Sequence, residues 1–451
     1  MEKLFKLKQN GTDVKTEIIA GITTFLAMAY ILAVNPGMLG IIPDGPGAAA
    51  IFMATALSAA IGTICMAFFA NYPVALASGM GLNAFFTYTV CLGMGYSYKV
   101  ALTAILIEGF VFIILSLFKF REALVNKIPK NLKLGITAGI GLFITIIALI
   151  NAGIVINNDS TLVGLGNLGS PQVVLAVVGL LIIGILHHYK VKGDILIGIL
   201  ATWVLGIIAE LAGWYVVDVE AGVYSLIPNL SWSSIKSNFA APALFQFDFS
   251  FVLKNFMSFA VVMFTFLYTD IFDTVGTLIG IASKGNLLDQ DGNLPKASGA
   301  LMADAVGTVA GACLGTSTVT SYVESSAGVA AGGRTGLTAL TAGIMFLVAI
   351  PFAPIFLAIP GFATAPAMLF VGLLMLSSVT QMDFESDIAD TIGGFLAIVM
   401  MPFAYSIATG IMFAIISWFV LKIFTGKIKD ISPVMWISVI LFVIYIATQI
   451  L

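Results

Sequence analysis

The sequence predicts an all-α polytopic membrane protein, and this prediction rests on composition, on repeated apolar runs and on the placement of basic residues. Of the 451 residues, 60% are hydrophobic and only 10% are charged, whereas soluble domains use roughly 25% charged residues. Apolar runs of about twenty residues, each long enough to cross a hydrocarbon core of roughly 30 Å, recur along the whole chain. We therefore expect the chain in a lipid bilayer.

Hydropathy and helix-breaking residues predict fourteen transmembrane spans in two sets of seven. The first set is expected at 18–38, 48–70, 75–91, 98–118, 132–152, 171–188 and 194–213. The second set is expected at 254–281, 297–313, 317–331, 335–356, 363–380, 387–403 and 405–424. Residues 214–253 are predicted to form an extracellular connection. The C-terminal apolar segment, 425–451, either crosses the membrane from Ile431 onward or lies against the bundle.

The basic residues predict the orientation. With a cytoplasmic N-terminus, the fourteen spans leave only Lys99, Lys236 and Lys254 of the 20 Lys and Arg residues outside. Cytoplasmic loops carry an excess of Lys and Arg, so a miscounted span would scramble this pattern. Residues 1–16 are polar and basic and lack a signal-peptide pattern. The predicted location is the inner (plasma) membrane, with the first span as the targeting signal.

The two halves of the chain show a weak, collinear similarity. Phe25 and Leu26 in the first span correspond to Phe266 and Leu267 in the eighth. A repeat with an odd number of spans must insert its second copy upside down, as in the inverted repeats of secondary transporters. We expect 1–213 and 254–424 to be two inverted repeats that work by alternating access.

The third and tenth spans are unusual because each opens with small, turn-prone residues. They read ASGMGLNAFF at 77–86 and GTSTVTSYVESSAG at 315–328. Gly79, Gly81 and Gly315 propagate a helix poorly, so we expect these spans to be broken, with short extended segments leading into half-helices at mid-membrane. The free N–H groups of two half-helices could bind a ligand's carbonyl or ring nitrogen. Alternatively, the glycines only allow close helix packing.

Three acidic residues fall deep within these apolar runs. The eighth span, FTFLYTDIFDTVGTLIG at 264–280, carries Asp270 and Asp273 three residues apart, and the tenth span adds Glu324. An ionised carboxylate at the bilayer centre costs at least a few kcal/mol, so such a residue is normally paired, protonated or functional. Asp273 and Asp270 are our candidates for proton coupling, unless either acid only caps a broken helix. Glu108, Glu210 and Asp304 are expected to be isolated packing or interface groups.

The polar positions suggest a site for a flat, hydrogen-bonding molecule. A carboxylate can accept two parallel N–H bonds from the edge of a purine base, and an Asn side chain can both donate and accept. Aromatic rings close in sequence to these positions could stack on such a base. The candidate rings are Phe85, Phe86, Phe272 and Tyr322, and the polar candidates for substrate binding are Glu324, Asp270, Asn83, Thr316 and Ser317.

These motifs resemble the AzgA-like adenine, guanine and hypoxanthine permeases of the nucleobase:cation symporter (xanthine/uracil permease) family. The resemblance is carried by GITTFLAMAYILAVNP at 21–36, by TDIFDTVGTLIG at 269–280, and by the 77–86 and 315–328 segments, all in the same order. It implies a core domain and a gate domain, with substrate between the two broken spans and the first and eighth spans. It also implies that Asp270, Glu324 and Asn83 bind the purine and that Asp273 takes part in transport.

The predicted function is secondary active import of adenine, guanine or hypoxanthine by cation symport, with a proton as the expected cation. An anion exchanger of the same fold is the alternative, because half-helix dipoles bind anions, although the nearby acids would repel one. Two histidines and three scattered cysteines predict neither an enzyme nucleophile nor a metal site. No cofactor and no nucleic acid partner is expected. The sequence leaves open the preferred purine, H⁺ or Na⁺ coupling, and a possible homodimer.

Overall fold

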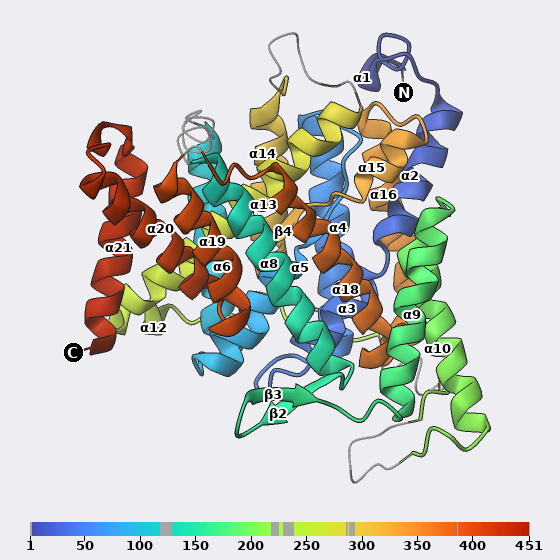
Figure 1. Cartoon of the computed structure of the whole chain (residues 1–451). Helices are drawn as coiled ribbons and strands as arrows, with labels where there is room; N and C mark the ends of the chain where they lie inside the picture. The colour runs from blue at the N-terminus through green and yellow to red at the C-terminus, as the bar shows by residue number, and fades with distance from the viewer. Residues whose placement is uncertain are drawn as a thin grey trace.

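The chain forms a helical bundle in the computed structural model, which describes residues 2–117, 129–217, 225–228, 239–285, 287, 294–385 and 387–450. Figure 1 shows long helices running side by side, with the N-terminus at one end of the bundle. In the described part of the chain, ten helices are long and apolar enough to cross a membrane. This confirms a helical polytopic membrane fold.

The first half of the chain contributes helices and three short strands. Its helices are α1 (Glu2–Phe5), α2 (Val14–Met28), α3 (Ile31–Leu39), α4 (Ala48–Phe69), α5 (Met80–Ala84), α6 (Tyr98–Leu117), α8 (Lys130–Asn151), α9 (Pro171–His188) and α10 (Asp194–Leu211). Its strands are β1 (Leu76–Ser78), β2 (Val155–Asn158) and β3 (Leu162–Leu165). Helix α5 continues as π-helical turns over Phe85–Gly93. Strands β2 and β3 form an exposed antiparallel hairpin.

The second half of the chain contributes helices and one short strand. Its helices are α12 (Phe249–Lys254), α13 (Phe256–Lys284), α14 (Ala297–Leu314), α15 (Ser325–Ala330), α16 (Gly336–Ala349), α17 (Ala353–Leu357), α18 (Gly361–Leu376), α19 (Ile388–Phe403), α20 (Ile407–Phe424) and α21 (Pro433–Ile450). Strand β4 spans Val319–Ser321. The long helices begin within about one helical turn of the residues at which spans were predicted to start.

Two predicted spans are interrupted. The first consists of α2 and α3, which are separated at Ala29 and Tyr30. The predicted span 335–356 consists of α16, a short 3₁₀ turn at Ile350–Phe352, and α17. Pro351 lies in that turn, and proline lacks the N–H that would continue the helix. The helical hydrogen bonds are therefore interrupted at Pro351, which has no N–H to donate.

Strands β1 and β4 pair across the middle of the bundle. They are antiparallel, with Ala77 opposite Thr320, and all six residues are buried. Backbone polar groups buried away from water need partners, and helices on either side supply them. The Thr63 hydroxyl of α4 bonds both the N–H and the C=O of Leu76 at 2.8 and 3.0 Å, and Thr308 of α14 donates to Val319 O at 3.0 Å.

Glycines let these helices approach the strands. A Cβ added at Gly62 of α4 or at Gly307 of α14 would lie 3.2 or 3.0 Å from Cγ1 of Val319. Such contacts are tighter than most side-chain packing, so an alanine at either position would require the Val319 side chain to shift by a few tenths of an ångström. The strand pair is thus enclosed between α4 and α14.

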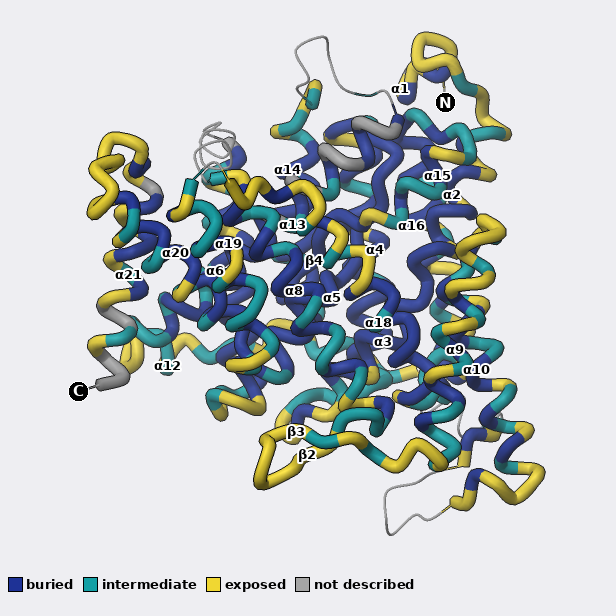
Figure 2. Tube along the Cα trace, viewed as in Figure 1, coloured by how far each residue is buried: buried dark blue, intermediate teal, exposed yellow. Residues whose placement is uncertain are grey.

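Helix contacts divide the bundle into two groups. In the first, α4 packs against α14 and α16, α2 packs against α15 and α16, and α6 packs against α13 and α14. In the second, α8 packs against α18 and α19, α19 packs against α20, and α9 packs against α10 and α18. Figure 2 shows that the outer surfaces of α9, α10 and α21 are exposed while the helices around β4 are buried.

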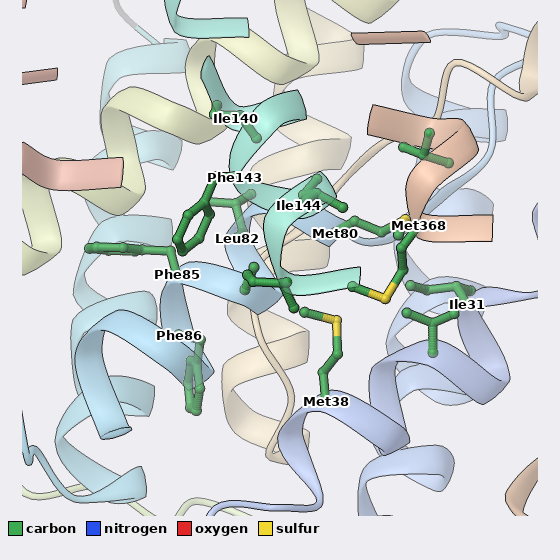
Figure 3. Close-up of a cluster of buried hydrophobic side chains, with 14 of the residues drawn as sticks. Ile31, Met38, Met80, Leu82, Phe85, Phe86, Ile140, Phe143, Ile144 and Met368 are labelled. Carbon is green, nitrogen blue, oxygen red and sulfur yellow. The ribbon is translucent and has the colours of Figure 1, made fainter. Parts of the chain in front are cut away.

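An apolar cluster lies where the two groups meet. Figure 3 shows Met80, Leu82, Phe85 and Phe86 of the α5 segment beside Ile140, Phe143 and Ile144 of α8, with Met38 of α3 and Met368 of α18 nearby. All of these side chains are buried. The cluster holds the α5 segment against α8.

The C-terminal helix α21 packs against α13 and α20. It runs along the side of the bundle in Figure 1. One face, including Met435 and Phe442, is buried, and Trp436, Ile437 and Ile440 are exposed. An apolar outer face of this kind suits contact with lipid tails.

Candidate functional site

The strand pair brings the two glycine-rich motifs together. The N–H of Gly79 donates to Thr318 O and the N–H of Tyr322 donates to Ala75 O, each at 3.0 Å. Beyond β1 the chain turns at Gly79 into α5, and beyond β4 it reaches Glu324 at the N-terminus of α15. The starts of two short helices therefore flank one strand pair.

A carboxylate cluster lies beside this strand pair, on a side that we call accessible because two of its acids are partly exposed. The Tyr30 hydroxyl, in the break between α2 and α3, donates to Glu324 Oε1 at 2.6 Å. Tyr30 is buried, while Glu324 and Asp273 are partly exposed. Asp273 and Tyr322 interact electrostatically with this pair. The first, eighth and tenth predicted spans thus converge on one acidic, accessible position.

The two acids of α13 occupy different surroundings. Asp273 Oδ2 lies 3.7 Å from the position that a Cβ on Gly79 would take, so it lies beside the start of α5. Asp270 is fully buried, and its Oδ1 is 3.3 Å from the Thr274 hydroxyl, one turn further along the helix. Of these two predicted site residues, Asp273 is therefore the one near Glu324 that is partly exposed.

Asp270 instead belongs to a buried group of acids. The group includes Glu108 and Asp304, which were expected from the sequence to be isolated. Glu108 and Asp304 do not stand alone, because the carboxyl of Glu108 interacts with those of Asp270 and Asp304. The Thr274 hydroxyl donates to Asp304 Oδ1 at 2.9 Å. Helix α6 packs against both α13 and α14, and each of the three helices brings one acid to this point; linear sequence gives no sign of that packing. Glu210, by contrast, accepts hydrogen bonds from Ser225 and Leu226 at the end of α10, away from both groups.

The predicted polar residues Asn83, Thr316 and Ser317 form a buried network. The Ser317 hydroxyl donates to Asn83 Oδ1, and the Ser78 and Thr316 hydroxyls are 3.2 Å apart. Asn35 of α3 donates to Thr316 Oγ1 at 2.9 Å. Asn83, Thr316 and Ser317 are fully buried. These buried hydrogen bonds therefore join the third predicted span to the tenth.

The predicted stacking rings do not share one role. Phe85 is fully buried and packs edge-on against Phe266, with ring centroids 4.7 Å apart. Phe86 is fully buried against Tyr98 at 5.1 Å. The hydroxyl of Tyr322 donates to the carbonyl oxygen of Ser78. The backbone of Phe272 belongs to α13, but its side chain lies outside the described residues.

Sequence reasoning missed Tyr30 and Asn35. Both carry polar groups inside the apolar first span, in AYILAVNP at 29–36, and both are buried with partners on the tenth span. A polar side chain inside a membrane span is itself a sign of function or of a specific partner. That sign was present, but the partner more than 280 residues away is visible only in the fold.

The accessible side, with its partly exposed acids, is chemically suited to a neutral molecule that carries N–H donors. Glu324 and Asp273 offer carboxylate oxygens, and the groups that interact most strongly with Asp273 are Asp270 and Glu324. Acidic groups that interact this strongly with one another also repel an anion. Among the described residues, no group of three His, Cys, Asp or Glu side chains is arranged to hold a metal ion.

Comparison with known sequences identifies the family. Residues 15–413 match the permease family model of the xanthine and uracil permeases. The adenine permease AdeP of Escherichia coli K12 is 40% identical over 447 residues, covering 99% of this chain and 96% of AdeP. The guanine/hypoxanthine permeases PbuG and PbuO of Bacillus subtilis 168 are 41% and 44% identical and cover 99% and 98% of this chain and 99% of each relative.

Solved structures show the same fold at low identity. The transmembrane domain of the cyanobacterial bicarbonate transporter BicA matches with a TM-score of 0.63 at 16% identity, covering 88% of this chain and 97% of that domain. The structure of SLC26A9 also has a TM-score of 0.63, at 10% identity, covering 91% of this chain and 66% of SLC26A9. These matches, together with the sequence relatives, show that the chain is a multi-pass membrane protein of the xanthine/uracil permease family, a transporter and not an enzyme.

Proposed function

We propose that this permease takes up purine nucleobases such as adenine, guanine or hypoxanthine. The observation that carries the proposal is the Glu324 carboxylate, held by Tyr30 and lying close to Asp273 at the accessible end of the β1–β4 pair. The named adenine and guanine/hypoxanthine permeases, at 40–44% identity over nearly the whole chain, support a purine as substrate.

In this proposal Glu324 accepts N–H groups from one edge of the purine, and Asp273 lies beside the same site. The N-terminus of α5 begins next to Asp273, and its free N–H groups are suited to a ring nitrogen or carbonyl oxygen of the base. The buried network of Asn83, Thr316 and Ser317 acts indirectly, because its hydrogen bonds hold the two motifs against each other. Burial of Phe85 gives it a packing role in the wall of the site.

We further propose that transport proceeds by alternating access between two inverted repeats, 1–213 and 254–424, each with seven spans. The third and tenth spans are then the broken ones, with β1 and β4 as their extended segments. The helix group around α4, α13 and α14 is the core domain, and the group around α8, α18 and α19 is the gate domain. The apolar character of the contact at Phe85 and Phe143 supports sliding between them, since few directional bonds would have to break.

The proposed location is the plasma membrane with a cytoplasmic N-terminus. In Figure 1 the α9–α10 connection lies at the ends of α9 and α10 that are nearer to the N-terminal segment, away from the β2–β3 hairpin. That connection carries Lys190 and Lys192, and basic loops favour the cytoplasmic side. The β2–β3 hairpin, at the opposite end, is then extracellular.

Uptake of radiolabelled purines into cells lacking their own nucleobase permeases tests this function. Adenine, guanine, hypoxanthine, xanthine and uracil are compared in cells that express the chain or carry the empty vector, with and without a protonophore. Uptake of at least one of the first three, lost on adding the protonophore, is the expected result. Absence of uptake for every nucleobase, with the protein present in the membrane, would contradict the proposal.

A further inference from the structure

Three acids on three helices meet in the dry interior beside β4. Glu108 of α6, Asp270 of α13 and Asp304 of α14 are each fully buried. Thr318 and Thr320 approach them from the β4 segment: the Thr318 hydroxyl donates to Glu108 Oε2 at 3.3 Å, and the Thr320 and Thr274 hydroxyls are 2.7 Å apart. We call Glu108, Asp270 and Asp304 the buried triad.

Glu108 lacks a donor that its position demands. Its Oε1 is buried and has no hydrogen-bond donor, and the donor to its Oε2 is at the long end of the hydrogen-bond range. Glu108 and Asp270 nevertheless lie within hydrogen-bonding reach of one another. Two ionised carboxylates have no proton to share, so this contact is a hydrogen bond only when one of the two is protonated.

The surroundings of Glu108 do not neutralise it. The charged groups that face it from the packed helices are Asp270 on α13 and Asp304 on α14, both acidic. Asp273, the next acid along α13, interacts with Asp270. None of the ion pairs formed by the described residues includes Glu108. A buried carboxylate among other carboxylates takes up a cation or a proton rather than remaining charged.

We propose that the buried triad is the site that carries the co-transported proton, separate from the substrate-facing acids Asp273 and Glu324. This inference rests on the proposed purine symport and assigns its coupling step to particular residues. One proton is shared between Glu108 and Asp270, and it leaves when the two carboxyl groups are separated. Of the two coupling candidates named from the sequence, Asp270 keeps this role as a member of the triad, and Asp273 does not.

The β4 segment links this site to the substrate. Thr318 and Thr320 flank Val319 and contact the triad side, while Glu324 follows in the same short segment and faces the accessible side. The Thr320 methyl also packs against Gly79 at the start of α5. A purine that draws Glu324 or α5 toward itself therefore shifts the hydroxyl groups that contact Glu108 and Thr274. Substrate binding and proton binding therefore both act on the backbone of residues 318–324.

Glu108→Gln in purified protein reconstituted into liposomes tests the assignment. Glutamine keeps the size of the side chain and supplies a permanent donor, so it imitates the protonated acid. Three activities are compared with wild type: purine-for-purine exchange at equal pH, accumulation driven by a pH gradient, and accumulation driven by a Na⁺ gradient without a pH gradient. Asp304→Asn is the second variant. Glu210→Gln, which alters an acid outside both groups, is the matched control.

The expected result is that both triad variants lose accumulation driven by the pH gradient by about tenfold or more while exchange persists, and that the control resembles wild type. Infrared spectroscopy gives a second readout, because a protonated carboxyl band present in wild type should weaken in Glu108→Gln even where transport is too slow to measure. Wild-type accumulation in both triad variants, or loss of purine exchange in a folded variant, would overturn the assignment. Accumulation driven by Na⁺ alone and lost in Glu108→Gln would replace the proton with Na⁺. A wild-type protein that binds no purine would instead refute the proposed function.

Discussion

At the scale of single residues, the contact between Tyr30 and Glu324 determines what the accessible side can bind. The phenol donates to one carboxylate oxygen, which fixes the side chain in one orientation without adding a positive charge. A carboxylate so held remains an acceptor toward a ligand. This favours neutral molecules with paired N–H groups over anions.

Glu324→Gln is expected to weaken purine binding strongly. The amide places an N–H₂ group where the proposed ligand also offers donors, and loss of a hydrogen bond to a charged group costs about 1.5–3 kcal/mol, roughly 10- to 150-fold in Kd. Binding of labelled adenine or hypoxanthine to purified protein measures this, with Glu210→Gln as control. A Kd equal to that of wild type would remove Glu324 from the site.

Tyr30→Phe tests the support of that carboxylate. The variant keeps the ring and loses the donor to the carboxylate, so Glu324 is less well oriented. Because Tyr30 acts on the ligand only through Glu324, the expected loss is about 1 kcal/mol, roughly fivefold in Kd. Purine affinity should therefore fall less than in Glu324→Gln, with the protein still folded. Affinity unchanged from wild type would show that the carboxylate is oriented by other groups.

Residue types and positions were enough to nominate Glu324 and Asp273, because an acid in an apolar run is costly and conspicuous. They were not enough to separate Asp273 from Asp270, since a spacing of three residues predicts a shared helix face while tertiary packing buries only one of them. The grouping of Glu108 with Asp304 was missed for the same reason. It depends on how α6 and α14 meet, which linear spacing does not reveal.

At the scale of elements, the β1–β4 pair depends on a turn that only glycine makes easily. Gly315 ends α14 with φ of +86°, and its carbonyl oxygen accepts from the Tyr98 hydroxyl at 2.6 Å. A Cβ there would lie 2.9 Å from both Cβ and O of Ala243. The residue thus sets the direction in which the chain enters β4.

Gly315→Ala is expected to lower thermal stability by more than the cost of the left-handed conformation, which is about 1 kcal/mol for alanine. Gly426→Ala is the matched control, because Gly426 has φ of +75° but open space around its Cβ position. Melting temperatures of the two purified variants in detergent make the comparison. Equal shifts would mean that the contact with Ala243 carries no cost.

A second element-scale feature is the link between α19 and α20. Asp387 caps α19 through Ala389 N at 2.8 Å and pairs with Lys422 and Lys427 at 2.7 and 2.8 Å. Partial burial of the Asp387 carboxyl opposes its ionisation, but the hydrogen bonds from the two lysines outweigh this and hold its pKa below the ordinary value. Because the folded-state pKa is lowered, the stabilisation is present above the unfolded pKa of about 3.9 and is lost as pH falls below it.

Asp387→Asn should therefore lower stability by the same amount at pH 6 and pH 8, about 1.5–3 kcal/mol for a charged hydrogen-bonded group. Thermal unfolding in detergent at the two pH values measures it, and the exposed Asp430→Asn serves as control. A loss that is large at pH 8 and absent at pH 6 would show that the carboxylate titrates near neutrality, which is incompatible with a lowered pKa.

Helix positions could be predicted because each needs an apolar run of fixed length, and α4, α6, α9 and α10 begin within about a turn of the expected residues. The pairing of β1 with β4 could not be predicted from the sequence. Short extended segments such as LAS and VTS carry no alternation long enough to read, and their partners lie far apart in the chain. What fixes them is the need to satisfy backbone groups in a dry interior.

At the scale of the whole molecule, two helix groups meet at an apolar contact beside an acidic, accessible position and a buried acidic triad. The sequence relatives place the chain in a permease family, while the fold is shared with bicarbonate and SLC26 transporters at low identity. Fold alone therefore does not select the substrate. In the proposed function the acids at the site provide that choice, because they favour a neutral donor-bearing ring over an anion.

The most direct test of the central claim is transport by the purified protein in liposomes with an imposed inward proton gradient. Labelled adenine, hypoxanthine, sulfate and bicarbonate are compared for wild type and Glu324→Gln. The account predicts accumulation of a purine by wild type, its loss in Glu324→Gln, and no accumulation of either anion. Anion transport without purine transport, or purine accumulation that is unaffected in Glu324→Gln, would contradict it.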